Sequence, residues 1–343
     1  MKKKLSRPRV LLTGGCGYIG AHVAVALYES EYIPVIYDNF STSEAQVVSH
    51  LKKIIPIDLS IIKGDVRDSF HLVKAIKEFE IDAVIHLAGI KVIADSISDP
   101  IEYYSNNISG MINVLNAAKI CQIQKIVFSS SASVYGLAEN SPVFETDQTL
   151  PLNPYARSKK YCEEILSDYS QSLDLCAAAS LRYFNPIGAH PSGDIGEFGT
   201  NGSRNIMRAI LDVAHGKNSV LKVFGSDYNT KDGTAVRDYI HVVDLANAHV
   251  SALRFLNNTI GHQIFNIGTG SGQTVLELIK VFELVAGKEI PYVFVSRRPG
   301  DVAECFADVE KSRNLMNWRA ERTLHQMCES AWSFELKNKH NFK

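Results

Sequence analysis

Two side chains four residues apart, Tyr155 and Lys159, could work together in proton transfer. Residues at this spacing share one face of a helix. A free phenol has a pKa of about 10 and is a poor base at neutral pH, but a nearby ammonium favours the phenolate. The pair could therefore act as a general base toward a substrate hydroxyl. The alternative is an ordinary surface helix that carries an aromatic residue and a lysine.

Hydroxyl groups are concentrated in residues 129–136, which read S-S-S-A-S-V-Y-G and overlap the end of a run typical of a buried strand. Side chains at the carboxyl end of a parallel strand face the cleft where α/β proteins bind ligands. Hydroxyls at this place could hydrogen-bond a substrate hydroxyl or carbonyl. We interpret a serine of this run, the tyrosine and the lysine as one catalytic set.

A glycine-rich turn over residues 13–20 (T-G-G-C-G-Y-I-G) follows a strand-like run and opens a helix-like one. Gly14 permits the sharp bend, Gly17 lets the backbone approach a pyrophosphate, and Gly20 allows close packing of helix on strand. The exposed N–H groups and the helix dipole would then hold the anion. Asp38 ends the next strand, where a carboxylate binds an adenosine ribose and repels a 2′-phosphate. The turn therefore predicts a dinucleotide site that prefers NAD to NADP.

A second carboxylate, Asp65, follows the short strand-like run 61–63. At the end of a strand it could meet the amino group of an adenine ring. It could equally serve as the N-cap of the helix that comes next, because aspartate is among the favoured capping residues. The sequence leaves both roles open.

These side chains need a scaffold, and the first half of the chain alternates short β-rich runs with helical stretches. That order predicts an α/β fold with a doubly wound parallel sheet, right-handed crossovers and ligands at the carboxyl ends of the strands. The expected strands are Val10–Thr13, Ile33–Tyr37, Ile61–Lys63, Ala83–Leu87, Ile126–Ser130 and Ala177–Tyr183, and the expected helices are Ala21–Ser30, Glu44–Lys52, Ser69–Glu78, Ile101–Cys121 and Tyr155–Ser172.

The pattern changes after residue 185, because residues 186–233 are rich in Gly, Pro, Asn and Asp and predict loops around one helix near Ser203–His215. A helix over Asp238–Phe255 is expected to pack back on the sheet. A strand over Gln263–Ile267, a helix over Val275–Ala286, a further strand and a terminal helix follow. We expect a dinucleotide-binding domain over 1–185, with 235–258 packed on it, and a smaller α/β substrate domain over 186–343.

Composition narrows the class of partner. The 343 residues include 45% apolar residues, 36 Lys and Arg and 37 Asp and Glu, which gives a formal net charge of −1. That balance argues against nucleic acid or an anionic membrane as the main partner. There is no apolar run of about 20 residues for a membrane span and no signal-peptide pattern. The six scattered cysteines predict a reducing cytosol, and Cys16, His190 and His241 lack the spacing of metal ligands.

Taken together, the glycine turn, the serine run and the Tyr-x-x-x-Lys pattern resemble the extended short-chain dehydrogenase/reductase superfamily. Three longer stretches, over 86–91, 181–193 and 232–242, resemble the UDP-glucose 4-epimerase family within it. The resemblance runs from about Arg9 to about Trp332. It implies a Rossmann domain with a tightly held NAD, and a homodimer formed through Ile101–Cys121 and Tyr155–Ser172.

The resemblance also implies a reaction, the interconversion of UDP-galactose and UDP-glucose. Tyr155 would take the proton from the sugar 4-hydroxyl while hydride passes to the nicotinamide. The 4-keto sugar would then turn about its diphosphate link and receive the hydride on its other face. Ser131 would hydrogen-bond the reacting oxygen with Ser133 close by, and Lys159 would bind the nicotinamide ribose and tune Tyr155.

Positions that match the family pattern give the site residues that the resemblance implies. The cofactor set is Gly14, Gly17, Tyr18, Ile19, Gly20, Asp38, Asn39, Ser43, Asp65, Val66, Leu87, Ala88, Gly89, Lys91, Asn106, Ser129, Tyr155, Lys159 and Phe184. The nucleotide-sugar set is Ser131, Ser133, Tyr155, Asn185, Asn205, Lys222, Val223, Phe224, Arg237, Arg298, Asp301 and Cys305. Arg237 and Arg298 are guanidinium forks suited to a diphosphate, although either could instead form a surface ion pair.

Two departures from the family pattern bear on specificity. The loop 198–204 differs from the bacterial pattern, so its contacts are open. Cys305 stands where some members carry tyrosine, which predicts room for a 2-acetamido group and the use of UDP-N-acetylglucosamine and its galacto-epimer. The alternatives are a 4,6-dehydratase, a decarboxylase or a uronic-acid epimerase of the same superfamily, and a non-catalytic NAD sensor. A dehydratase would carry an Asp-Glu pair where this chain has Ala132 and Ser133.

Overall fold

A seven-stranded sheet forms the centre of the computed structural model, which describes residues 7–137, 140–198, 205–298 and 300–338. Every neighbouring pair of its strands is parallel, and the strand order is β3-β2-β1-β4-β5-β6-β11. The order reverses between β1 and β4, as in the predicted doubly wound sheet. The strands are β1 (Arg9–Thr13), β2 (Ile33–Asp38), β3 (Ile61–Lys63), β4 (Ala83–His86), β5 (Lys125–Ser131), β6 (Ala177–Tyr183) and β11 (Gly261–Ile267).

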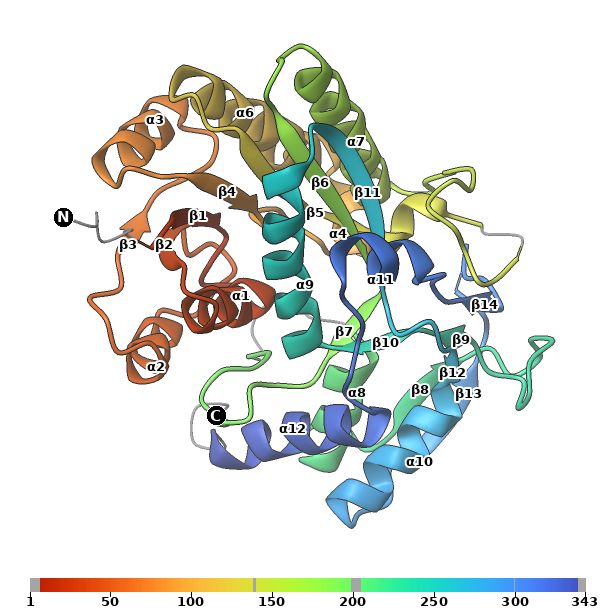
Figure 1. Ribbon diagram of the computed structural model, residues 1–343. Helices are drawn as coiled ribbons and strands as arrows, with labels where there is room; N and C mark the ends of the chain where they lie inside the picture. The colour runs from red at the N-terminus through yellow and green to blue at the C-terminus, as the bar shows by residue number, and fades with distance from the viewer. Residues whose placement is uncertain (1–6, 138–139, 199–204, 299, 339–343) are drawn as a thin grey trace.

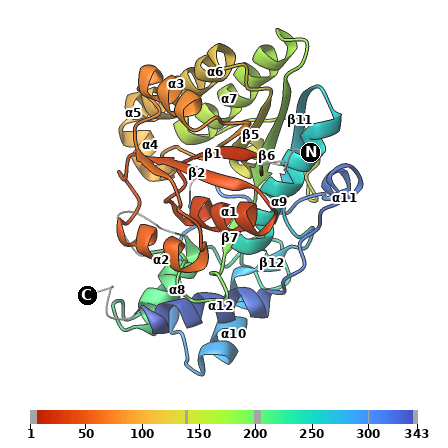
Figure 2. The same cartoon turned by 60° about the vertical axis from the view of Figure 1, so that its left-hand side comes forward.

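Helices cover both faces of this sheet, which is why its strands read as apolar runs without alternation (Figures 1 and 2). One face packs against α1 (Tyr18–Glu29), α2 (Gln46–Ile54) and α9 (Val242–Phe255), and strand residues such as Leu12 point into that core. The other face packs against α3 (Ser69–Glu78), α6 (Gly110–Ile120) and α7 (Pro154–Gln171), with Leu11 in the core. The predicted α/β layers are confirmed.

The long helix predicted over Ile101–Cys121 is wrong as a single element. The chain instead forms α5 (Pro100–Tyr104), a π-helical turn (Ser105–Ser109) and then α6, and an unpredicted α4 (Ile93–Ser98) precedes them. The π turn holds the amide of Asn107, which is buried and exchanges hydrogen bonds with the backbone of Ile90. A wider turn at this point lets the side chain leave the helix surface toward a neighbouring loop.

The later part of the chain builds three small sheets below the large one (Figure 1). Their pairs are β7 with β10, β9 with β12 and β14, and β8 with β13. The helix predicted over Asp238–Phe255 begins only at Val242, because the residues before it are extended. The bounds are β7 (Asn185–Ile187), β8 (Leu221–Phe224), β9 (Val236–Arg237), β10 (Tyr239–His241), β12 (Gln273–Thr274), β13 (Tyr292–Val295) and β14 (Glu304–Cys305).

A separate hydrophobic core joins α8 (Ile206–Ala214), α10 (Val275–Ala286) and α12 (Leu324–Lys337) in this region. Residues 203 and 204 of the predicted helix 203–215 lie outside the described residues. The chain also returns to the large sheet, since β11 pairs with β6 and α9 packs beside α1. A short helix, α11 (Glu310–Met316), contacts both α9 and β11. Over the ranges described above, no helix is long and apolar enough to cross a membrane.

Candidate active site

A cavity of about 500 Å³ opens where the carboxyl ends of β1, β2, β4 and β5 meet, and the glycine turn forms its floor. Gly14 has a φ of +72°, and a Cβ atom there would lie 2.7 Å from the backbone nitrogen of Ala88. A Cβ atom at Gly20 would lie 2.2 Å from the carbonyl oxygen of Gly14. Gly17 is the N-cap of α1, so the first turn of the helix faces the cavity. This cradle fits the predicted pyrophosphate site, because only glycine permits these approaches.

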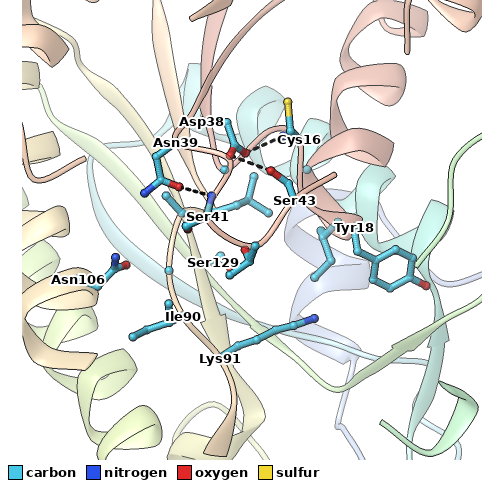
Figure 3. A pocket seen from close by; sticks show the side chains of 18 of the residues that line it. Cys16, Tyr18, Asp38, Asn39, Ser41, Ser43, Ile90, Lys91, Asn106 and Ser129 are labelled. Atoms are coloured by element: carbon cyan, nitrogen blue, oxygen red, sulfur yellow. Dashed lines mark hydrogen bonds between the residues drawn. The ribbon is translucent and has the colours of Figure 1, made fainter. Parts of the chain in front are cut away.

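Asp38 connects the glycine turn to the end of β2 (Figure 3). One carboxylate oxygen accepts a hydrogen bond from the backbone N–H of Cys16 at 2.9 Å. The other accepts from the N–H of Phe40 at 2.8 Å and from the Ser43 hydroxyl at 3.0 Å. Asp38 also lines the cavity, as Asn39 and Ser43 do. The carboxylate is thus placed at the cavity wall in a fixed orientation, as ribose recognition requires.

Asp65 follows β3 and is held in place by neighbouring side chains. Its carboxylate is bound on both oxygens by Arg67, at 3.0 and 2.9 Å, and accepts from the Asn39 amide at 3.0 Å. The Arg67 guanidinium holds the pKa of this carboxyl well below its usual range. Asp68 caps α3 through the N–H of His71, so the capping role predicted for Asp65 is wrong. Asp65 lies outside the cavity lining, and its contact with adenine stays a prediction.

The predicted catalytic set comes together from two neighbouring elements. Tyr155 and Lys159 on α7 line the cavity, and the side chain of Ser131, at the end of β5, is close enough to Tyr155 to lower the pKa of its phenol. Ser131 also accepts from the Ser133 hydroxyl at 2.9 Å. The ammonium of Lys159 donates to the carbonyl oxygen of Ser129 at 2.7 Å. The structure therefore places a phenol, a hydroxyl and an ammonium at one edge of the cavity.

Burial shifts the pKa values of both Tyr155 and Lys159. Burial raises the pKa of Tyr155, and the side chain of Ser131 opposes this shift only in part. Burial also lowers the pKa of Lys159 to about 8. Burial is thus the largest influence on the pKa of the phenol, and activation of Tyr155 by Lys159 together with a positively charged nicotinamide stays a prediction. A positive charge from a bound cofactor remains the source that could lower the pKa of the phenol.

Most of the predicted cofactor residues share this one cavity. Seventeen of the nineteen line it, and the exceptions are Asp65 and Phe184. Phe184 is buried against Val134 and Val143 in a small apolar cluster. Ile90, within the loop 87–91 that the resemblance placed at the cofactor, lines the cavity as well. The sequence missed other lining residues, among them Cys16, Tyr37, Ser41, Thr42, Tyr183, Ile195, Gly196, Glu197 and Phe198. For Tyr183 the signal was its place at the end of β6, whereas the segment 195–198 carries no motif.

Ser131, Ser133 and Tyr155 apart, the predicted nucleotide-sugar residues lie in the later part of the chain, most of them on or beside the small sheets. Arg237 on β9 pairs in register with Cys305 on β14, and its guanidinium forms an ion pair with Asp301. The Arg298 guanidinium lies 3.9 Å from the centre of the Phe224 ring. These residues lie outside the lining of the cofactor cavity.

The remaining members of that set have structural partners. Asn185 donates its backbone N–H to the carbonyl oxygen of Asp238 at 2.9 Å. Asn205 caps α8 and donates its amide to Glu197 at 2.5 Å, and Glu197 in turn lies 3.7 Å from the Lys91 ammonium. On β8 the side chain of Lys222 is exposed. That of Val223 is 1% exposed and belongs to the core, so its side chain cannot contact a ligand.

The residues considered as metal ligands have other partners. His241 contacts the hydroxyl of Ser330 at 3.0 Å, and His190 that of Ser192 at 2.9 Å. Burial raises the pKa of the Cys16 thiol to about 12, so it is a poor nucleophile. Among the described residues, no group of three or more His, Cys, Asp or Glu side chains could hold a metal ion.

Comparisons with known proteins place this site in a family. A family model described as GDP-mannose 4,6 dehydratase matches residues 11–331. The UDP-glucose 4-epimerase of Bacillus subtilis (strain 168) is 46% identical over 334 residues, which are 97% of this chain and 98% of that protein.

Two crystal structures of UDP-glucose 4-epimerases agree closely with the fold. That from Stenotrophomonas maltophila, with bound NAD and formylated UDP-arabinopyranose, has a TM-score of 0.95 and 41% identity over 97% of this chain and 99% of that chain. That from Bifidobacterium longum, in complex with NAD+ and UDP, has a TM-score of 0.92 and 40% identity over 97% of this chain and 100% of that chain. With such identity over nearly the whole length, the chain belongs to the UDP-glucose 4-epimerase family of the extended short-chain dehydrogenases/reductases.

Proposed function

We propose that this protein interconverts UDP-galactose and UDP-glucose by transient oxidation at C4 of the sugar. The observation that carries the proposal is the position of Tyr155 beside Ser131, with Lys159, at the edge of the cavity that the glycine turn lines. A fold alone would not specify chemistry, whereas this set of groups supplies a proton acceptor beside a binding site.

NAD is the cofactor that the cavity fits, with its pyrophosphate at the glycine turn and its adenosine ribose at Asp38. When bound, NAD supplies the hydride acceptor and donor that oxidation and reduction at C4 require. Lys91 and Asn106 line the same cavity and would help to position it. The Lys159 ammonium, fixed on the Ser129 carbonyl, would contact the nicotinamide ribose.

Proton transfer falls to Tyr155, whose oxygen would take the proton of the sugar 4-hydroxyl and later return it. Ser131 lies beside this phenol and would hold the reacting oxygen there. Arg237 and Arg298 would bind the diphosphate through their guanidinium groups. Because Arg237 now pairs with Asp301, a diphosphate would compete with that carboxylate for the guanidinium.

The decisive experiment needs no added cofactor. Purified protein is incubated with UDP-galactose, and UDP-glucose is followed by proton NMR. We expect conversion from retained NAD, and Tyr155→Phe should lose most of the rate while keeping its NAD content. A 4-keto-6-deoxy product would instead indicate a dehydratase, although Ala132 and Ser133 offer it no carboxylate. Turnover only of UDP-glucuronic acid would indicate a uronic-acid epimerase. NAD binding without any turnover would indicate a sensor.

The sugar pocket is proposed to admit a 2-acetamido group because of Cys305. The Cys305 side chain packs against a small apolar cluster that contains Val134 and Phe184. Val134 belongs to the turn that follows Ser131 at the end of β5, so Cys305 lies near the proposed reacting oxygen. A cysteine there leaves more room than a tyrosine would. UDP-N-acetylglucosamine should therefore be a substrate, and Cys305→Tyr should lower the acetamido-sugar rate more than the UDP-galactose rate. An unchanged ratio of the two rates would refute this specificity.

A homodimer is also part of the proposal. Exposed apolar side chains lie on the two segments expected at the interface: Ile101 is 73% exposed, Ile120 59% and Tyr161 44%. Burying such a surface in a second copy would be favourable. Sedimentation equilibrium should give twice the chain mass, and Ile101→Glu should reduce it to one. All six cysteines are free thiols, which supports a cytosolic location.

A further inference from the structure

A carboxylate that no motif marks lies directly behind the catalytic set. Glu163 on α7 is 1% exposed. It accepts a hydrogen bond from the Ser130 hydroxyl at 2.5 Å and two from the Arg182 guanidinium, at 2.9 and 2.8 Å. Ser130 belongs to β5 and Arg182 to β6, so one side chain joins the catalytic helix to two central strands.

The partners of this carboxylate are themselves fixed. Arg182 also donates to the carbonyl oxygen of Glu145 at 3.2 Å, and its guanidinium lies 4.8 Å from the centre of the Tyr135 ring. The Tyr135 hydroxyl donates to the side-chain oxygen of Asn266 at 2.6 Å. A buried network in which each group has a partner is rigid, whereas a partly satisfied one would be costly.

The spacing of the contacts links this network to catalysis. Tyr155, Lys159 and Glu163 follow one another at intervals of four on α7, and all three contact the consecutive serines 129–131 of β5. Of these contacts, only that of Glu163 continues into an ion pair with a third element. Replacing a buried ion pair by apolar residues is often neutral or stabilising, so stability alone does not explain such a pair.

We propose that Glu163 is a positioning residue, which locks α7 onto β5 and β6 so that Tyr155 and Lys159 stay in register with the serines. The inference rests on the proposed function. In this arrangement a small shift of α7 would move the phenol away from Ser131, and displacements of about 1 Å in such a site can cost about 100-fold in rate.

Glu163 also acts on its neighbour by charge. Its carboxylate and the Cys162 thiol raise the pKa of Lys159, against the lowering caused by burial. The other titratable groups that face this pair are His86 toward Lys159, and Arg182 and His262 toward Glu163. Removing the charge of Glu163 while Arg182 remains should therefore lower the pKa of Lys159, and a residue that only supports the fold would not have this effect.

Glu163→Gln tests the proposal, with Glu164→Gln as the matched control on the exposed side of the same helix, where Glu164 pairs with Lys160. For Glu163→Gln we expect kcat with UDP-galactose to fall by about tenfold or more, with KM within about twofold and NAD content unchanged. The alkaline limb of the kcat profile should move to lower pH. Ser130→Ala should reduce kcat without moving that limb, because it removes a contact and no charge.

Two further measurements keep the test open to refutation. The double variant Glu163→Gln, Arg182→Met removes both charges of the ion pair. It leaves no buried guanidinium without a partner, so it can be tested even if Glu163→Gln alone does not fold. An NMR titration of carbon-labelled lysine, with Lys159 assigned through Lys159→Arg, reads the Lys159 pKa without turnover. Wild-type inactivity on UDP-galactose would refute the proposed function alone. An unchanged kcat and an unchanged Lys159 titration in the folded charge-removing variants would overturn the role of Glu163.

Discussion

Acid should unfold this protein through four buried histidines. His22, His86, His241 and His249 are each at most 2% exposed. Burial lowers the pKa of His22, His86 and His241 to about 3 and that of His249 to about 4. They lie on α1, at the end of β4, at the N-cap of α9 and within α9, so their protonation would disturb the core on both faces of the large sheet.

The magnitude follows from linkage between protonation and folding. An unfolded chain protonates its histidines at a pKa of about 6.5, whereas these four stay neutral in the fold until about pH 4. The stability from these groups is present above pH 6.5 and is lost as the pH falls from 6.5 toward 4. Over this range each histidine lowers the free energy of unfolding by about 1.4 kcal/mol per pH unit, and the four together lower it by about 5.5 kcal/mol per pH unit. A domain stability of about 5–15 kcal/mol would be exhausted within about one to three pH units.

Urea unfolding followed by tryptophan fluorescence between pH 7.5 and 4.5 measures this slope. The NAD content is held equal in all samples, because a bound cofactor adds its own stability. We expect an uptake of at least about four protons on unfolding near pH 5, because burial also lowers the pKa of His262 to about 4. His22→Gln should remove one of them. Within the part of the chain that the structure describes, Nε2 of His22 has no hydrogen-bond partner, and a glutamine amide can replace the contact of Nδ1 with the Tyr18 carbonyl oxygen, so the change should cost little stability. His325→Gln on the exposed side of α12 is the control. An uptake below two protons, or an unchanged uptake in His22→Gln, would refute the reasoning.

Three other predictions concern single residues. Gly20→Ala should abolish NAD retention, measured on cofactor released from purified protein, because its methyl group would lie 2.2 Å from the Gly14 carbonyl oxygen. Gly216→Ala is the control: its methyl group meets nothing within 4 Å, so its φ of +74° adds backbone strain without filling the cofactor cavity. Asp238→Asn should destabilise the fold by about 2–4 kcal/mol in urea, because the carboxylate accepts from Thr269, Gly270 and Ala307, and an amide would turn N–H groups toward these donors. Arg237→Met should raise the KM for UDP-galactose by about tenfold or more without changing NAD content, and an unchanged KM would exclude Arg237 from diphosphate binding.

The parts of the fold that sequence alone predicted are those with a local physical signal. β3, β6, α3 and α10 have the predicted bounds, and the other strands from β1 to β5 agree within one or two residues, because buried parallel strands read as compact apolar runs. The glycine turn could also be predicted from sequence, because Gly14 and Gly20 occupy positions that exclude any side chain. The same holds for Tyr155 and Lys159, whose helical spacing places them on one face.

Other features have no local signal. β9, β12 and β14 contain two residues each, and tertiary pairing rather than propensity makes them extended. The π turn at Asn107 depends on a loop 17 residues earlier in the chain. Lining residues such as Ile195 and Phe198 enter the cavity because the later part of the chain returns over α1, which no motif predicts.

The pKa of Tyr155 shows why a catalytic motif does not by itself specify catalysis. The Tyr-x-x-x-Lys pattern predicts an ammonium that favours the phenolate, whereas in the fold that ammonium donates to the Ser129 carbonyl, and burial raises the pKa of the phenol. The protein's own groups therefore hold Tyr155 in the protonated form at neutral pH. If a cofactor cation provides the remaining shift, proton abstraction becomes possible only where a hydride acceptor is already in place. Burial of Tyr155 would then make its basicity depend on bound cofactor. Proton abstraction by Tyr155 and hydride transfer to the cofactor would therefore begin together.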